Sequence, residues 1–187
     1  MQRGRILRTI MMKLINLYEP ESRFDLALSE ISSDMIQQFH RHWLQICSNG
    51  RLPKRADIDP ANFKRILPSV ILTNIERDPF RVRYRLCGTK VAEFCGNLTG
   101  RYLDEIATGN VWSAAGYLRR YQIAATEGRP VFSFDWMIGQ FGTRHPFQTG
   151  VWPLASDGRT VDLCIAVEDY LKLRSTDMEP SAVLQAH

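Results

Sequence analysis

The chain has 187 residues, of which 24 are Lys or Arg and 20 are Asp or Glu, so its formal net charge is +4. With 44% hydrophobic and 24% charged residues it has the composition of a globular protein, which excludes a disordered or fibrous chain. No uncharged apolar run approaches the ~20 residues that a membrane-spanning helix requires. We therefore expect a single globular domain and no transmembrane segment.

The positive charge is concentrated at the N-terminus. Basic residues outnumber acidic ones in residues 1–23, whereas the rest of the chain is nearly neutral. A nucleic-acid-binding domain usually carries a basic face, so we expect no nucleic-acid partner. The cysteines form no C-x-x-C pair and follow no secretion signal, which predicts reduced thiols and a cytoplasmic location. They are Cys47, Cys87, Cys95 and Cys164.

The first predicted element is a basic, amphipathic extension, residues 1–33. Three alternatives remain open for it: a frayed terminus, a helix on a membrane surface or partner, and a helix that packs in a dimer. Ser33 is then predicted to cap a helix over residues 34–48. Its apolar residues recur every three or four positions; they are Met35, Ile36, Phe39, Trp43 and Ile46. This helix either covers the sheet of its own chain or pairs with its copy in a homodimer.

A hairpin follows a short helix that begins at Asp59-Pro60 and ends near Leu67-Pro68. The hairpin strands are predicted at residues 69–76 and 80–87. Along the second strand, one face is mostly apolar and the other is basic. The apolar face consists of Phe80, Val82, Tyr84 and Leu86, and the basic face of Arg81, Arg83 and Arg85. The basic face is either the solvated side of the sheet or a site for an acidic partner.

Helices and three further strands complete the predicted order. Helices are expected at residues 89–95, 103–106 and 110–126, and strands at 130–138, 144–155 and 160–171. Asp157-Gly158 predicts the turn between the last two strands. About 40 helical residues between a hairpin and a meander predict an α+β fold with the helices across one face of an antiparallel sheet, and a ligand pocket between the two layers.

Two stretches of sequence carry a resemblance to a known family. One runs from Leu52-Pro53 through Asp59-Pro60 and Leu67-Pro68 to Tyr84-Arg85-Leu86 and Gly88-Thr89, and the other is Leu98-Thr99-Gly100-Arg101-Tyr102-Leu103-Asp104. With the element order, they resemble the PAS domain family, in particular stand-alone bacterial members, over about residues 35–172. We place the PAS-like domain at residues 34–172, after the extension 1–33 and before a polar tail, 173–187.

The resemblance implies a fold and a function. The fold is a five-stranded antiparallel sheet in the order 2-1-5-4-3, with helices on one face and an N-terminal helical extension. The function is that of a sensory or regulatory module that acts in trans, through an unidentified signalling protein or through self-association. A homodimer formed by the N-terminal helices is one expected assembly.

The sequence argues against two cofactors of PAS domains. Flavin-binding members use the cysteine of a Gly-x-Asn-Cys-Arg-Phe-Leu-Gln motif, and Gly100 stands at that position here. Haem-binding members need an axial ligand, commonly a histidine of the long helix, and residues 110–126 contain none. His145 or a methionine remains the minority alternative for a haem ligand. We expect neither cofactor and leave an unidentified small molecule open.

The candidate ligand-binding residues are large aromatic side chains. They are Phe94, Trp112, Tyr117, Tyr121, Phe134 and Trp136. Either such residues fill the core completely, or they surround an apolar or aromatic small molecule that Tyr117, Tyr121 or Thr149 orients.

A small α+β pocket enzyme, such as an isomerase or hydratase, is the competing class. It would need an acid or base in the pocket with a shifted pKa. Asp135 alternates onto the face opposite Phe134 and Trp136, and Asp162 and Glu168 would lie about 20 Å apart along one strand. We therefore expect no catalytic site.

Overall fold

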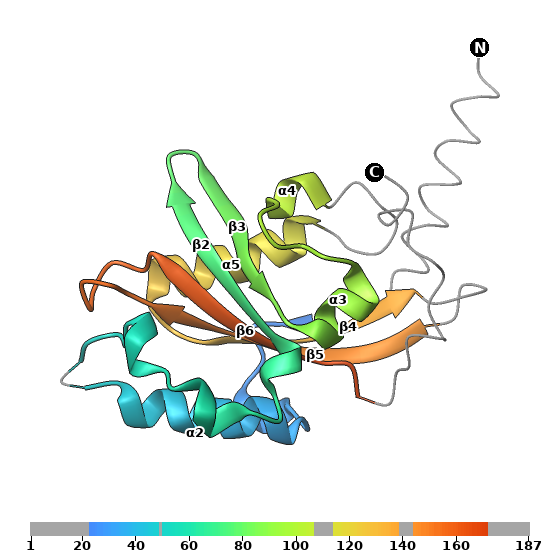
Figure 1. The fold of residues 1–187 in the computed structure, drawn as a ribbon, viewed down its shortest axis with the longest axis horizontal. Helices are drawn as coiled ribbons and strands as arrows, with labels where there is room; N and C mark the ends of the chain where they lie inside the picture. The colour runs from blue at the N-terminus through green and yellow to red at the C-terminus, as the bar shows by residue number, and fades with distance from the viewer. Residues whose placement is uncertain (1–22, 49, 107–113, 139–143, 172–187) are drawn as a thin grey trace, which may run out of the picture.

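The structure of the chain is a computed structural model that describes residues 23–48, 50–106, 114–138 and 144–171. Its centre is an antiparallel sheet with the strand order β1-β4-β5-β6-β2-β3 (Figure 1). The strands are β1 (Arg23–Phe24), β2 (Val70–Arg77), β3 (Phe80–Cys87), β4 (Val131–Ile138), β5 (Arg144–Leu154) and β6 (Leu163–Asp169). The five long strands, counted along the chain, lie in the predicted order 2-1-5-4-3, and the short β1 extends the sheet beyond β4.

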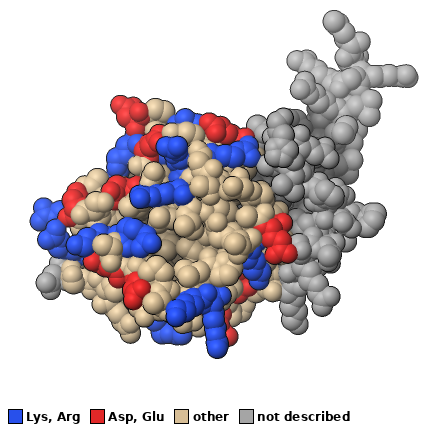
Figure 2. All heavy atoms as spheres, viewed as in Figure 1, with Lys and Arg blue, Asp and Glu red and all other residues tan. Residues whose placement is uncertain are grey.

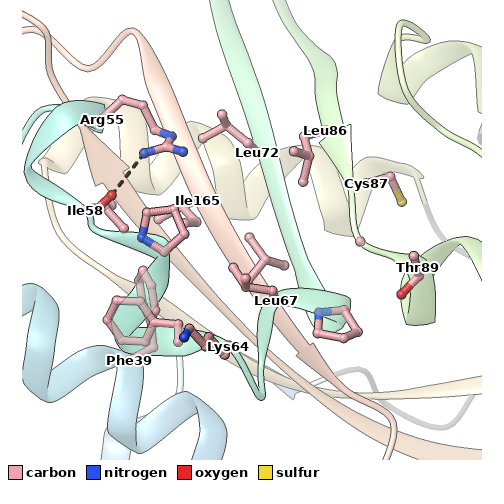
Figure 3. Close-up of a pocket in the computed structure, with 15 residues that line it drawn as sticks. Phe39, Arg55, Ile58, Lys64, Leu67, Leu72, Leu86, Cys87, Thr89 and Ile165 are labelled. Atoms are coloured by element: carbon pink, nitrogen blue, oxygen red, sulfur yellow. Dashed lines mark hydrogen bonds between the residues drawn. The ribbon is translucent and has the colours of Figure 1, made fainter.

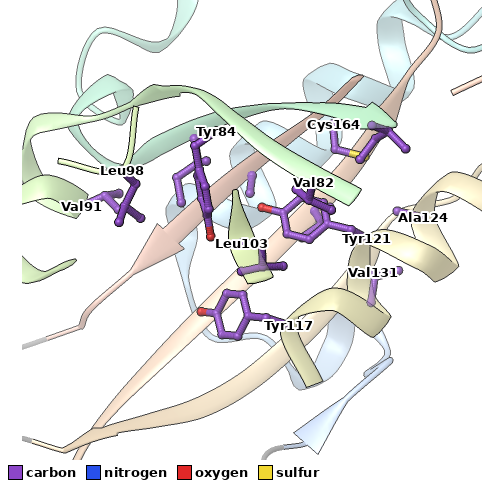
Figure 4. Packing of buried hydrophobic residues seen from close by; sticks show 14 of the residues in the cluster. Val82, Tyr84, Val91, Leu98, Leu103, Tyr117, Tyr121, Ala124, Val131 and Cys164 are labelled. Atoms are coloured by element: carbon purple, nitrogen blue, oxygen red, sulfur yellow. The ribbon is translucent and has the colours of Figure 1, made fainter. Parts of the chain in front are cut away.

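The helices between β3 and β4 cover one face of the sheet, which we call the α5 face. They are α3 (Thr89–Cys95), α4 (Leu103–Ile106) and α5 (Ala114–Glu127). Their apolar side chains pack on alternate residues of the strands (Figure 4). The buried cluster includes Val82, Tyr84, Tyr117, Tyr121, Phe147 and Cys164. This layer is the helical layer that the sequence predicts across one face of the sheet.

The opposite face, which we call the α2 face, is also covered. Helix α2 (Asp34–Ile46) begins where Ser33 caps the amide of Ile36, as predicted, and packs on β5 and β6. Four short 3-10 segments complete this layer: η1 (Leu28–Glu30), η2 (Arg55–Asp57), η3 (Pro60–Phe63) and η4 (Leu67–Ser69). The expectation of helices on one face therefore holds only for α3 to α5, because the apolar stripe of α2 covers the sheet of its own chain.

Trp152 organises the core of the α2 face. Its ring is fully buried and packs edge-on against Phe39 of α2, with 4.7 Å between ring centroids. Gly150, two residues earlier on the same side of β5, leaves room for it, because a Cβ there would lie 2.4 Å from the indole. The indole Nε1 donates to Nδ1 of His40 over 3.1 Å. These contacts fix α2 against the sheet.

A bulge in β3 breaks the alternation that the sequence predicts. Leu72 is paired with Leu86, but the next residue of β2, Thr73, is paired with Tyr84, so Arg85 has no partner across the ladder. One extra residue reverses the direction of the side chains that follow it. Leu86 was expected to share a face with Tyr84. It lies instead on the α2 face beside Leu72, where it is 48% exposed.

Two of the three arginines of β3 contact the segment that follows α3. Arg81 forms an ion pair with Asp104 at 2.9 Å, and its guanidinium lies 3.6 Å from the ring centroid of Tyr102. The guanidinium of Arg83 donates to the carbonyl of Gly100. Arg81 and Arg83 of the basic face are therefore engaged by residues 100–104 of the same chain.

The predicted termini fall outside the described residues. Residues 1–22 of the extension and the tail 173–187 are in this group. Within the described ranges, no helix combines the length and the apolar composition needed to cross a membrane.

Candidate functional site

Buried polar side chains gather under α5, and we call this group the interior polar cluster. It consists of Tyr117, Arg120, Ser133, Asp135, Glu168 and Tyr170. Tyr117 and Arg120 are three residues apart on α5, so they share one side of the helix. The other members follow the two-residue alternation of β4 and β6, which directs them toward α5. All six are at most 5% exposed.

Glu168 is at the centre of the cluster. The Tyr117 hydroxyl donates to its Oε1 over 3.2 Å, and the Tyr170 hydroxyl donates to its Oε2 in a short hydrogen bond. Burial raises the pKa of Glu168 to about 7, although the tyrosine hydroxyls and Arg120 act in the opposite direction. The side chain therefore titrates near neutral pH.

A buried ion pair lies beside Glu168. Arg120 Nη2 is 2.6 Å from Asp135 Oδ1, and the two side chains are 2% and 4% exposed. Ser133 donates to the other carboxylate oxygen over 3.0 Å. Burial opposes the charge of Arg120, but Tyr117, Asp135 and Glu168 outweigh it and raise its pKa. A paired charge of this kind is costly to disrupt.

Some hydrogen-bonding atoms of this region lack a partner. Among the buried side-chain atoms of the described residues, Arg120 Nε, Arg120 Nη1 and Thr149 Oγ1 form no hydrogen bond. The guanidinium instead lies over the Tyr117 ring, 4.1 Å from its centroid. Unpaired buried donors are energetically unfavourable, so the cluster has unused capacity to bind an acceptor group.

Three of the six predicted ligand-binding residues lie in the core of the α5 face. Tyr117 and Tyr121 extend from α5, and Phe94 extends from α3, as members of one buried cluster. Figure 4 shows the rings of Tyr84, Tyr117 and Tyr121 around Leu103. Phe94 packs on Tyr170 with 4.2 Å between ring centroids. The fourth residue, Trp112, lies outside the described residues.

The remaining two predicted residues are not part of this group, so the structure does not bring them together with Phe94, Tyr117 and Tyr121. Phe134 and Trp136 pack on each other with ring centroids 5.4 Å apart, and they share their face of β4 with Phe132, which belongs to the core of the α2 face. Their aromatic character suggested the pocket side, but α2 provides a second buried layer. Alternation instead directs Asp135 toward α5.

The polar centre of the site is not evident from the sequence, because alternation does not say which face of the sheet α5 covers. Alternation puts Asp135 on the face opposite Phe134 and Trp136 and puts Glu168 far from Asp162 along one strand, and no pattern singles out Arg120. Asp162 is indeed outside the cluster, since its carboxylate accepts bonds from Ser156 in the β5–β6 turn. The signal that could have found Glu168 is the two-residue period of β6, which puts Glu168 on the same face as Cys164, a member of the core of the α5 face.

The features relevant to cofactors are also placed by the structure. Gly100 lies in a turn, and its amide donates to the carbonyl of Tyr84. Cys95 is partly buried with its Sγ 3.9 Å from the Tyr170 hydroxyl, and desolvation raises the pKa of its thiol. A thiol of raised pKa is a weak nucleophile. Across the described ranges, no group of three His, Cys, Asp or Glu side chains could hold a metal ion.

The interior polar cluster is linked through β6 to the start of α2. Asp169, the residue after Glu168, accepts a hydrogen bond of 2.6 Å from the Ser33 hydroxyl. The Ser33 amide donates to Gln148 Oε1 over 2.8 Å, and Gln148 is paired with Asp169 across β5 and β6. Consecutive residues of one strand therefore contact the interior cluster and the cap of α2.

Comparisons with known proteins identify the family. Two solved structures are similar to the chain at 16% sequence identity each: an RNA-binding light-oxygen-voltage receptor, with a TM-score of 0.39, and a fungal LOV domain photoreceptor, with a TM-score of 0.41. The similarity covers 63% and 78% of this chain, respectively, and 33% and 95% of those chains, so the chain spans about a third of the first receptor. No curated protein matches. A family model described as a PAS domain matches residues 31–126, slightly more than half of the chain. The chain belongs to the PAS domain family.

Proposed function

We propose that the chain is a sensory module in which the interior polar cluster detects a small molecule or a proton and α2 transmits the change to a protein partner. The observation that carries this proposal is the position of two successive residues of β6. Glu168 accepts hydrogen bonds from Tyr117 and Tyr170 inside the domain, and Asp169 accepts one from Ser33 at the cap of α2. A displacement of β6 would alter both sets of bonds.

The ligand that fits the interior is a small molecule with an apolar or aromatic body and a hydrogen-bond acceptor. Tyr121 and Phe94 provide apolar contact, and the unpaired donors of Arg120 and Thr149 provide polar contact. Pockets for small ligands commonly combine an apolar lining with a few such groups. The pKa of Glu168, about 7, makes the charge of the cluster sensitive to a ligand that changes its solvation.

A sensory role agrees better with the cluster than catalysis does. Glu168 has the raised pKa of a general acid, which is the feature that favours an isomerase or hydratase. Both of its oxygens, however, accept hydrogen bonds from Tyr117 and Tyr170. PAS domains are as a rule sensory, and we propose no catalytic role here.

Amide hydrogen exchange tests the link between cluster and helix. We expect the first turn of α2 to exchange at different rates at pH 5.5 and pH 8 after correction for intrinsic exchange, because Glu168 changes charge between these values. In Glu168→Gln that difference should disappear. Arg159→Gln, a change of an exposed residue in the β5–β6 turn, is the control and should behave like the unaltered chain. An identical pH response in Glu168→Gln would contradict the proposal.

Native mass spectrometry tests the ligand and the assembly together. A retained small molecule would appear as a mass increment, and its addition to ligand-free protein should raise the denaturation midpoint, since binding to the native state stabilises it. Midpoints unmoved by a broad panel of metabolites would count against ligand sensing. We propose the N-terminal extension as the self-association element. Removal of residues 1–30 should then halve the mass of a homodimer, and an unchanged mass would exclude that interface.

A further inference from the structure

A groove of about 500 Å³ opens on the α2 face, separated from the interior polar cluster by the sheet. It lies between α2, the segment η2–η4 and the bulged end of β3 (Figure 3). Its floor is formed by Phe39, Leu72 and Ile165. A volume in this range is typical of small-molecule sites.

The groove has an apolar lining that is partly open to solvent. Leu67 and Leu86, which both line it, are 38% and 48% exposed. Leu86 reaches the groove only because of the bulge at Arg85. Exposed leucines around a concavity are a feature of binding surfaces rather than of ordinary protein surface. Figure 2, drawn in the orientation of Figure 1, shows that this side of the molecule has a broad surface area without charged side chains.

The charges that border the groove are of one sign. Arg55 and Lys64 are among its lining residues, and none of the lining residues is acidic. Arg55 donates one hydrogen bond, to the carbonyl of Ile58 over 3.1 Å. Neither Arg55 nor Lys64 forms an ion pair with any residue that the structure describes. Both cations are therefore available to an anion at the border of the groove.

The carboxylates of Asp57 and Asp59, in the same η2–η4 segment, accept hydrogen bonds from backbone amides. Asp57 accepts a hydrogen bond from the Lys54 amide, and Asp59 accepts one from the Ala61 amide, so each caps a 3-10 turn. Neither Asp57 nor Asp59 lines the groove, whose charged lining residues are Arg55 and Lys64.

We propose that this groove binds a small amphiphilic anion, whose apolar body lies on Phe39, Leu72 and Leu86 and whose carboxylate lies at the border of the groove, in the positive potential of Arg55 and Lys64. The occupant follows from the pairing of an apolar floor with two cations that have no ion-pair partner. The site is distinct from the interior polar cluster, because it lies on the other side of the sheet.

Calorimetric titration of the full chain with sodium decanoate, below its critical micelle concentration, tests the proposal. We expect saturable binding of decanoate with one site per chain, much weaker binding of 1-decanol, and none of decyltrimethylammonium. Indole fluorescence provides a second readout, because Phe39 contacts Trp152. Absence of decanoate binding, or equal binding of all three probes, would overturn the proposal.

Variants locate the site. Lys64→Gln and Arg55→Gln should each weaken decanoate binding about fivefold, as expected for loss of one partly solvated ion pair. Leu86→Glu should abolish binding, because it places a carboxylate at the groove, and its exposed position keeps the variant folded. Arg159→Gln is the matched control and should bind normally. If Lys64→Gln and Leu86→Glu both bind like the unaltered chain, or if the groove proves to be covered by a second copy of the chain in solution, the assignment is wrong.

Discussion

Each face of the sheet buries an apolar cluster, but the two faces differ in chemistry. Under α5 the core contains Glu168 and the Arg120–Asp135 ion pair, all close to fully buried. Under α2 the core is formed by aliphatic and aromatic groups and opens into a groove with cations at its border. The α5 face therefore combines apolar packing with polar contacts that a proton can alter, whereas the α2 face depends mainly on packing. Perturbations of the two faces should differ in size and in their dependence on pH.

The largest effect is expected from breaking the buried ion pair. Asp135→Asn leaves the Arg120 charge buried without its counter-ion and should lower the free energy of unfolding by about 3–5 kcal/mol. Urea denaturation followed by fluorescence measures the loss. The double variant Arg120→Met/Asp135→Leu removes both charges and should recover most of the stability. A double variant with a lower free energy of unfolding than Asp135→Asn would contradict this expectation. It would show that the two side chains stabilise the fold by more than neutralising each other's charge.

Glu168→Gln should change the pH dependence of stability. Because the pKa of Glu168 is raised from its ordinary 4.5 to about 7, the folded chain holds a proton that the unfolded chain has released between these values. The stabilisation is thus fully present below about pH 4.5 and is lost as the pH rises through about 7. It amounts to on the order of 3 kcal/mol. Urea titrations at pH 5 and pH 8 should show this difference in the unaltered chain and a much smaller one in Glu168→Gln. An equal change in the free energy of unfolding between pH 5 and pH 8 in the two proteins would contradict the assignment of this pH dependence to Glu168.

An intermediate effect is expected where the two faces are linked. Ser33→Ala removes the cap of α2 and the hydrogen bond to Asp169, and should cost about 1–2 kcal/mol. The interior cluster would remain intact, so the pH dependence assigned to Glu168 should persist. Ser33→Thr keeps the hydroxyl and is the control. Loss of the pH dependence in Ser33→Ala would show that the α2 cap and the cluster cannot be perturbed separately.

The smallest effect on stability should come from the groove. Leu86→Ser replaces a half-exposed leucine and should change the free energy of unfolding by less than about 0.5 kcal/mol, while weakening decanoate binding. A thermal denaturation curve and a decanoate titration on the same sample separate the two quantities. A large destabilisation would indicate that Leu86 is part of the core of the α2 face.

Much of the fold could be predicted because its signals are local. Ser33 as the cap of α2, β3 at residues 80–87 and the turn at Asp157-Gly158 are all confirmed. The faces of the strands were harder to predict, since alternation separates two sides without saying which one a helix covers. For that reason the pattern does not show that Phe134 and Trp136 lie apart from Tyr117 and Tyr121.

The interior polar cluster could not be predicted from local pattern. Arg120 reads as a surface residue of an amphipathic helix until its distance to Asp135 is known, and the pKa of Glu168 depends on burial by three separate segments. The position of Leu86 in the groove depends on a bulge for which the even alternation of β3 gives no indication. Each of these features arises from contacts between residues far apart in the chain.

The bulge at Arg85 has a consequence for how this strand can diverge. Val82 and Tyr84, before the bulge, pack in the core of the α5 face, whereas Leu86, after it, lines the groove. The apolar side chains of the strand therefore change from one face of the sheet to the other at the bulge. Deleting Arg85 would restore regular pairing and would leave the leucine directly after Tyr84, still opposite Leu72 and therefore still on the α2 face. Among related sequences, the groove should therefore depend on the leucine that pairs with the position of Leu72, whether or not the extra residue is present.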